Sequence, residues 1–175
     1  MRWFVREVWP LVRERRSDAT LAIVGHGPTA ALRSLCEGDA SIAVTGRVPD
    51  VRDWLWESAV GIAPLHVARG VQNKALEAIA AGLPIVITDA VAGGLPPQAM
   101  PATRVANTPQ AFAEQVLDLL RLSPTDRCAI AASANLSALT WSQTLAPLWS
   151  ILERAAGSSH LRAESAVAHI AWRSA

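Results

Sequence analysis

The residues best suited to chemistry lie between residues 64 and 84, where polar side chains interrupt an otherwise apolar pattern. Gln72, Asn73 and Lys74 form a polar triplet at the expected start of a helix, and Lys74 is the only lysine in the sequence. Free backbone N–H groups and the helix dipole favour an anion at such a position. Together with the positive charge of Lys74, this arrangement points to the binding of a phosphate group.

Glu77 lies three residues after Lys74, so both side chains can project from the same face of the helix. A cation beside a carboxylate suits a nucleoside diphosphate, because the cation can bind phosphate and the carboxylate can accept hydrogen bonds from ribose hydroxyl groups. The same spacing is also typical of an exposed salt bridge, and Gln72 or Asn73 can simply cap the helix. From the residues alone, both interpretations stay open.

The elements that would position these side chains alternate between short apolar runs and helical patterns. The apolar runs predict buried strands at residues 20–24, 41–45, 59–64 and 84–88, and a short fifth strand at 103–106. Helices are predicted at residues 1–16 with a break at Pro10, at 29–36, from Asp50, at 72–81, and from Pro109 and Pro124. This alternation is typical of βαβ units, so we expect an α/β fold with a Rossmann-like parallel sheet flanked by helices.

Composition places the chain among globular proteins that have one core. With 51% hydrophobic and 18% charged residues, a disordered polar chain is excluded, and a net charge of +1 gives no support to nucleic-acid binding through bulk charge. Cys36 and Cys128 are far apart and have no partner at metal-ligand spacing. Without a signal peptide or a membrane-spanning run, we expect a cytoplasmic protein, with an ordered domain at residues 1–155 and a poorly ordered tail at 156–175.

Five segments resemble, in the same order, the carboxy-terminal, donor-binding domain of GT-B glycosyltransferases, in particular the retaining enzymes of family 4. They are AIVGHGP at 22–28, VTGRVPD at 44–50, APL at 63–65, LEAIAAGLPIV at 76–86 and TWS at 140–142. The segment ARGVQNK at 68–74 is similar to a narrower bacterial subgroup, the sugar transferases linked to exopolysaccharide and PEP-CTERM/exosortase gene clusters.

The resemblance implies a site for a nucleotide-diphosphate sugar. Of the family's two glutamates eight residues apart, the second, which contacts the ribose, matches Glu77, whereas the first falls at Arg69. An arginine has only donors, so Arg69 could face the pyrophosphate or an acidic sugar instead. The family's base-binding loop matches Gly46, Arg47 and Val48, where backbone groups would hold the nucleobase. An ordinary turn between a strand and a helix explains these three residues equally well.

On this basis Lys74 is predicted to bind the diphosphate and Glu77 the ribose. Gln72, Asn73 and Arg69 are predicted to bind the phosphate or the donor sugar. No metal or other cofactor is expected, because a helix N-terminus and basic side chains can neutralise the leaving diphosphate. No catalytic residue is predicted in this chain.

The resemblance covers only the donor-binding half of a GT-B enzyme. Neither the amino-terminal domain, which makes most acceptor contacts, nor the first strand of the carboxy-terminal domain has a match, so we expect a fragment with an unpaired sheet edge. The intact enzyme would transfer a hexose, with retention, to a polysaccharide or lipid-linked acceptor, and would meet a membrane only through the missing half. The chain alone would be inactive and could self-associate.

The alternative is a non-catalytic α/β domain that binds a nucleotide or a partner protein. Seven tryptophans support it, since aromatic side chains are frequent at interfaces. Trp3, Trp9, Trp141 and Trp149 fall in segments that would pack near the missing domain. An in-frame amino-terminal domain encoded upstream would favour the enzyme, and a promoter there would favour the alternative.

Overall fold

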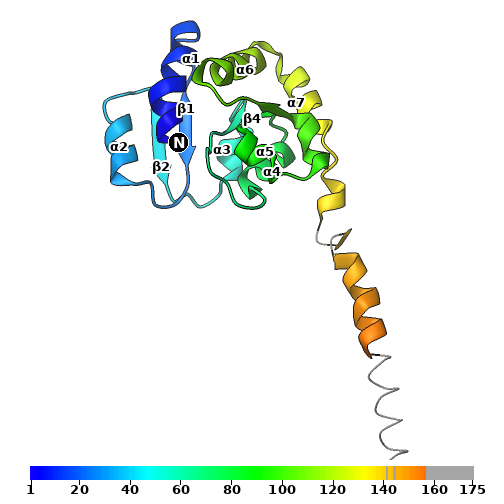
Figure 1. The fold of residues 1–175 in the computed structure, drawn as a ribbon. Coiled ribbons are helices and arrows are strands. Elements are labelled where there is room, and N and C mark those ends of the chain that lie inside the picture. Colours follow the sequence, from blue (N-terminus) through cyan, green and yellow to red (C-terminus); the bar gives the residue numbers. More distant parts are fainter. Residues whose placement is uncertain (141, 144, 157–175) are drawn as a thin grey trace, which may run out of the picture. The chain divides into compact units, whose positions relative to one another are not determined.

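The computed structural model of the chain describes residues 1–140, 142–143 and 145–156. They belong to two compact units, one at Met1–Asn135 and one that begins at Leu136. The strands and the predicted donor site lie in the first unit (Figure 1). The predicted tail at 156–175 lies almost entirely outside the described residues, so its boundary stays a prediction.

The strands of the first unit are all parallel and form two sheets. In one, β1 (Leu21–Val24) pairs with β2 (Ile42–Gly46). In the other, the order is β3 (Gly61–Ala63), β4 (Ile85–Ile87) and β5 (Thr103–Val105). The five predicted strands and their parallel pairing are confirmed, but one continuous sheet is not formed, because β1 and β3 each pair along one edge only within the described part of the chain.

Helices connect and flank these strands. They are α1 (Trp9–Arg15), α2 (Ala30–Cys36), α3 (Arg52–Trp56), α4 (Asn73–Ala80), α5 (Asp89–Ala92), α6 (Pro109–Arg121) and α7 (Pro124–Ala132). A π-helical turn at Phe4–Val8 precedes α1, and 3-10 turns lie at Pro97–Ala102 and Ser137–Leu139. The structure therefore adds α5, whose four residues are too few to give a periodic pattern.

Local signals fix several helix starts. The Thr108 and Ser123 side chains accept hydrogen bonds from the backbone three residues on, ahead of a proline in the first turn, as the sequence predicts. Asp50 does accept a hydrogen bond from the Arg52 backbone N–H at 2.8 Å, but the N-cap position of α3 falls at Val51. The helix predicted from Asp50 therefore begins two residues later, at Arg52.

The break expected at Pro10 takes the form of the π-helical turn before it. Proline has no backbone N–H to donate to the preceding turn. Here the N–H of Trp9 donates to the carbonyl of Phe4, five residues back, and α1 continues through Pro10. The helical axis is thus maintained across the proline.

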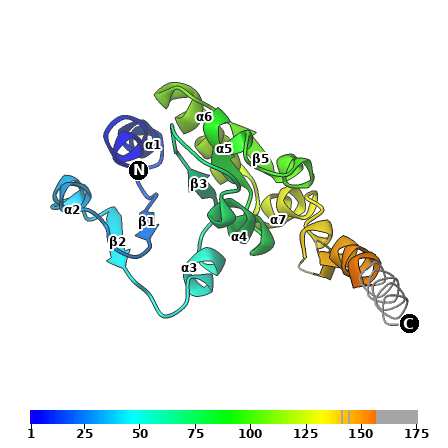
Figure 2. The ribbon, with the colours of Figure 1, turned by 60° about the horizontal axis from the view of Figure 1, so that its bottom comes forward.

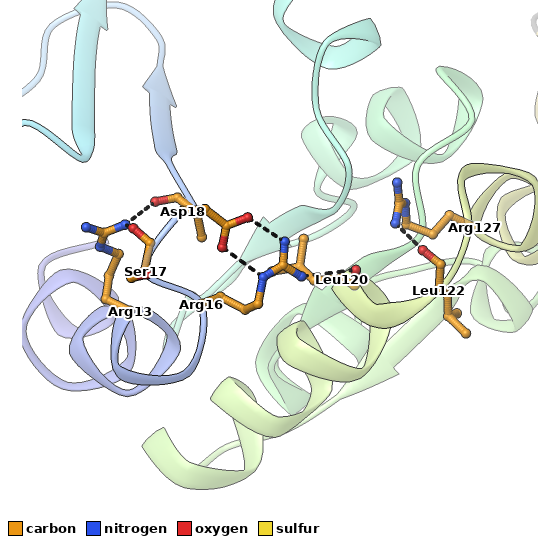
Figure 3. Close-up of polar contacts among 8 residues, drawn as sticks. Arg13, Arg16, Ser17, Asp18, Leu120, Leu122 and Arg127 are labelled. Atoms are coloured by element: carbon orange, nitrogen blue, oxygen red, sulfur yellow. Dashed lines mark hydrogen bonds and ion pairs between the residues drawn. The ribbon is translucent and has the colours of Figure 1, made fainter.

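The core joins this first helical segment to α6 and to both sheets. Phe4, Val8 and Val12 are buried with Val86 of β4 and Phe112 of α6, and Figure 1 shows α1 alongside α6. The end of α1 is tied to the next loop and to the end of α6 by arginine side chains (Figure 3).

Two tryptophans that the sequence suggested as interface residues belong to this core. Trp9 is 5% exposed, and its indole N–H donates to the Ser41 hydroxyl at 3.1 Å. The ring of Trp3 packs edge-on against His66, with 4.5 Å between centroids. Trp9 in particular is unavailable to a partner. Trp141 lies outside the described residues.

The described part of the second unit contains a 3-10 turn and a helical segment that is described as far as residue 156. In the helical segment, Leu145, Leu148, Trp149 and Leu152 are exposed and have the spacing of one helical face. No helix in the described residues is both long and apolar enough to cross a bilayer.

Candidate donor-binding site

Helix α4 presents the predicted phosphate-binding residues at its start. Ala75, Ala78 and Ile79 are buried, and the helix packs on β3 and β4. The opposite face, with Lys74 and Glu77, is exposed. Burial of one face therefore fixes which side chains α4 turns to solvent, and both candidate donor ligands are among them.

Neither Lys74 nor Glu77 forms an ion pair within the described part of the chain. The exposed salt bridge that their spacing allows is therefore not made. Lys74 therefore keeps an uncompensated positive charge at the start of α4, which favours an anion.

The start of α4 is not closed by a side chain. Gln72 holds the N-cap position but accepts no hydrogen bond from the helix. Its side-chain amide instead points back to the carbonyls of Arg69 and Gly70, each at 3.4 Å. Asn73 is the first helical residue rather than a cap. The first backbone N–H groups of α4 are thus not occupied by the predicted capping side chains.

The loop before α4 is held by contacts from distant parts of the chain. The Thr88 hydroxyl donates to the carbonyl of Leu65, and the Trp3 ring rests on His66. Near the end of this loop, the backbone of Gly70 lies close to Gly94. A Cβ added at Gly94 would lie only 2.4 Å from the carbonyl oxygen of Gly70. Gly94 is therefore a positioning residue that the sequence analysis missed, and the Gly93–Gly94 pair was the available signal.

A cavity of about 570 Å³ lies between α3 and α4, two helices that Figure 2 shows near each other. Glu77 lines it from α4, and Asp50, Arg52 and Trp56 line it from the other side. Among these, Glu77 is the only predicted donor ligand, and the other three come from a segment that the sequence analysis did not assign to the site.

The remaining predicted residues lie around this cavity or away from it. Gly46 ends β2, and Arg47 and Val48 follow in the turn that leads to Pro49, where the cavity lining begins. Arg69 is exposed in the loop before α4. Within the described part of the chain, no hydrogen bond or ion pair connects Gly46, Arg47 or Val48 to Lys74 or Glu77. The geometry therefore brings Glu77, but not the whole predicted set, to the cavity.

Asp50 and Arg52 form a fixed pair at this cavity. The Arg52 Nε donates to both carboxylate oxygens at 3.0 and 2.9 Å, and its Nη2 donates to Oδ2 at 2.6 Å. These hydrogen bonds hold the pKa of Asp50 below its ordinary value. The described residues contain no cluster of three or more His, Cys, Asp or Glu side chains placed to hold a metal ion.

Comparison with known proteins agrees with this arrangement at the level of family. The family described as "Glycosyl transferases group 1" matches residues 1–122, which include both sheets, the loop before α4 and the cavity. No curated protein and no solved structure matches the chain. Since the match covers well over half of the 175 residues, the chain belongs to the group 1 glycosyltransferase family.

Proposed function

We propose that the open start of α4 and the cavity beside it bind a nucleotide-diphosphate sugar as glycosyl donor. The observation that carries this proposal concerns Lys74 and Glu77. Both lie on the same exposed face of α4, and neither forms an ion pair among the described residues. An unpaired cation at a helix N-terminus suits a diphosphate, and a nearby carboxylate suits ribose hydroxyl groups.

Within this proposal, Gln72, Asn73 and Arg69 contact the phosphates or the donor sugar, and the turn at 46–48 contacts the nucleobase. No metal is required, because the helix N-terminus and Lys74 supply the positive potential that the leaving diphosphate needs. Addition of EDTA should then leave nucleotide affinity unchanged. A loss of affinity that Mg²⁺ restores would contradict the metal-free site.

The resemblance to retaining GT-B enzymes supports a wider proposal for the reaction. A second Rossmann-like domain would hold a polysaccharide or lipid-linked acceptor, and a hexose would be transferred to it with retention, in bacterial exopolysaccharide synthesis in the cytoplasm. Positioning of the acceptor can contribute about 7–11 kcal/mol of barrier lowering. Residues 1–175 alone are therefore expected not to transfer sugar, and turnover by the purified chain that disappears in Glu77→Ala would contradict this.

The binding site is tested by calorimetric titration of nucleoside diphosphates into the chain. Lys74→Ala should weaken binding about tenfold, since it removes a charge-assisted hydrogen bond to phosphate. Glu77→Gln should weaken it less, because an amide oxygen can still accept one hydrogen bond. Glu14→Gln is the matched control, since Glu14 is an exposed residue of α1. Unchanged affinity in both site variants would contradict the proposal.

A partner-binding function is the second candidate, and the helical segment of the second unit favours it. The face formed by Leu145, Leu148, Trp149 and Leu152 is apolar and exposed. Faces of this kind are frequent at protein interfaces. If the chain binds no nucleotide, while Trp149→Ala abolishes capture of a purified partner, this second function is favoured over the first.

A further inference from the structure

One wall of the cavity between α3 and α4 carries an arginine, Arg52, that is hydrogen-bonded along one edge to a carboxylate. Asp50 engages the Nε edge and Nη2 of Arg52 by three hydrogen bonds. A guanidinium has five N–H donors, so the edge formed by Nη1 and the second Nη2 proton still has donors to offer. Within the described residues, no hydrogen bond from Nη1 is formed.

The charge of this arginine is largely compensated by its partner. Because the Asp50 carboxylate balances the guanidinium, a second anion such as a phosphate gains little here. A neutral group with two adjacent acceptors gains both hydrogen bonds without losing the existing pair. The free edge of Arg52 therefore suits the rim of a heterocycle better than it suits a phosphate.

Trp56 adds a flat apolar surface beside this edge. Residues 52 and 56 are four apart on α3, so their side chains project from the same face of the helix. Both line the cavity, and the indole is 64% exposed. An exposed indole and a donor edge that line the same cavity are the combination with which proteins stack and recognise a nucleobase.

The opposite wall completes the site. Glu77 and Ala80 line the cavity from α4, and its volume of about 570 Å³ is ample for a base and a ribose. If Glu77 holds the ribose, as the proposed function has it, the base attached to that ribose would extend toward α3.

We infer that this cavity is a guanine pocket, in which the base stacks on Trp56 while Arg52 donates to O6 and N7. The inference rests on the proposed function and assigns the nucleotide class of its donor. Guanine presents two neighbouring acceptors on this edge. Adenine presents an amino donor beside N7, which would meet the N–H groups of Arg52, and uracil lacks the second acceptor. The donor would thus be a guanosine-diphosphate sugar.

The test compares the affinities of GDP, ADP, UDP and inorganic pyrophosphate for the 175-residue chain by calorimetry. GDP is expected to bind about tenfold more tightly than ADP and UDP, because the bidentate contact of Arg52 adds to the stacking and ribose contacts that all three nucleotides share. All three should bind more tightly than pyrophosphate, which has neither base nor ribose. Trp56→Ala should weaken the binding of all three nucleotides and leave pyrophosphate binding unchanged. Trp56→Phe should retain most of the gain, since phenylalanine still offers a stacking face.

Two further variants separate the base contact from the fold and from the phosphate site. Arg52→Gln should remove the preference for GDP over ADP. Ile151→Ala is the control, because that apolar side chain is 52% exposed in the second unit, and it should change nothing. Equal affinities of GDP, ADP and UDP for the unaltered chain would overturn the guanine pocket and leave the phosphate site standing. A Lys74→Ala variant that binds pyrophosphate normally would contradict the proposed function instead.

Discussion

The two sheets of the first unit differ in how completely their strands are enclosed. In β4, the three residues Ile85–Ile87 are at most 1% exposed. In β1, Leu21 is buried, whereas Ala22 is exposed and Ile23 is half-buried. The strand β4 pairs with β3 on one edge and with β5 on the other, but among the described residues β1 pairs with β2 alone. An apolar run of the same length therefore has a different environment in each sheet.

This difference shows what an apolar run can and cannot predict. The apolar runs at residues 20–24, 41–45 and 59–64 predict buried strands in the same sense as the run at 84–88. For β4 this prediction is correct. For β1, β2 and β3 it is wrong in part, because several of their residues keep access to solvent. Burial of a strand depends on neighbours on both edges and cover on both faces, and the strand's own residues do not report these.

The largest expected effect is a difference in stability between two variants, each of which shortens one isoleucine in one of the two sheets. Ile87→Ala removes a side chain that is 0% exposed and should destabilise the protein by about 3–4 kcal/mol, since the surrounding core cannot fill the space. Ile23→Ala, at a half-buried position, should cost only about 1 kcal/mol. The measurement is the free energy of unfolding in urea. Equal losses for the two variants would mean that the sheets are enclosed to the same extent.

A smaller loss of stability is expected from a change that displaces the loop between β3 and α4, which leads to the predicted phosphate-binding residues. Gly94→Ala would bring a Cβ to 2.4 Å from the Gly70 carbonyl oxygen, so the loop before α4 must shift, at about 2 kcal/mol in stability and with weaker nucleotide binding. Gly93→Ala is the adjacent control, because its Cβ would meet only an ordinary contact of 3.5 Å with the Asp89 carbonyl oxygen. If Gly94→Ala binds nucleotide like Gly93→Ala, this contact does not position the loop.

The smallest effect concerns the loop that leads into β1. Hydrogen bonds from Arg16 lower the pKa of Asp18 from 3.8 to about 2 (Figure 3). A depressed pKa in the folded state contributes stability above the unfolded value of 3.8, and this contribution is lost as the pH falls toward 2. Asp18→Asn should therefore flatten the pH dependence of unfolding slightly in that window. A variant with the slope of the unaltered protein would contradict the assignment. Because both side chains are exposed, the change will be small.

Local features of the sequence predicted the helices of this fold well. The proline–cap pairs at Thr108 and Ser123 and the glycine after α4, Gly82 with φ +89°, act within one turn, so adjacent residues reveal them. The prediction of α4 at 72–81 agrees with the observed Asn73–Ala80 because burial of one face sets its period.

The candidate site was predicted less completely because it depends on contacts between distant residues. The approach of Gly94 to Gly70 joins positions that no local pattern connects. Trp56 has the spacing of a helical residue, and only the placement of α3 beside α4 brings it to the same cavity as Glu77. The same holds for Trp9, whose bond to Ser41 buries an indole that the sequence suggested for an interface.

The central claim is that the donor binds at the start of α4, the helix that packs on the better enclosed sheet of β3, β4 and β5. Hydrogen exchange of backbone amides with and without a saturating nucleoside diphosphate tests it most directly, because the first N–H groups of a helix exchange freely until an anion accepts their hydrogen bonds. We expect slower exchange at Asn73 and Lys74, whose N–H groups precede the first hydrogen-bonded N–H of the helix, and little change in β1 and in residues 42–45 of β2. Nucleotide binding that leaves these amides unchanged, or that slows exchange only around β1 and β2, would contradict it.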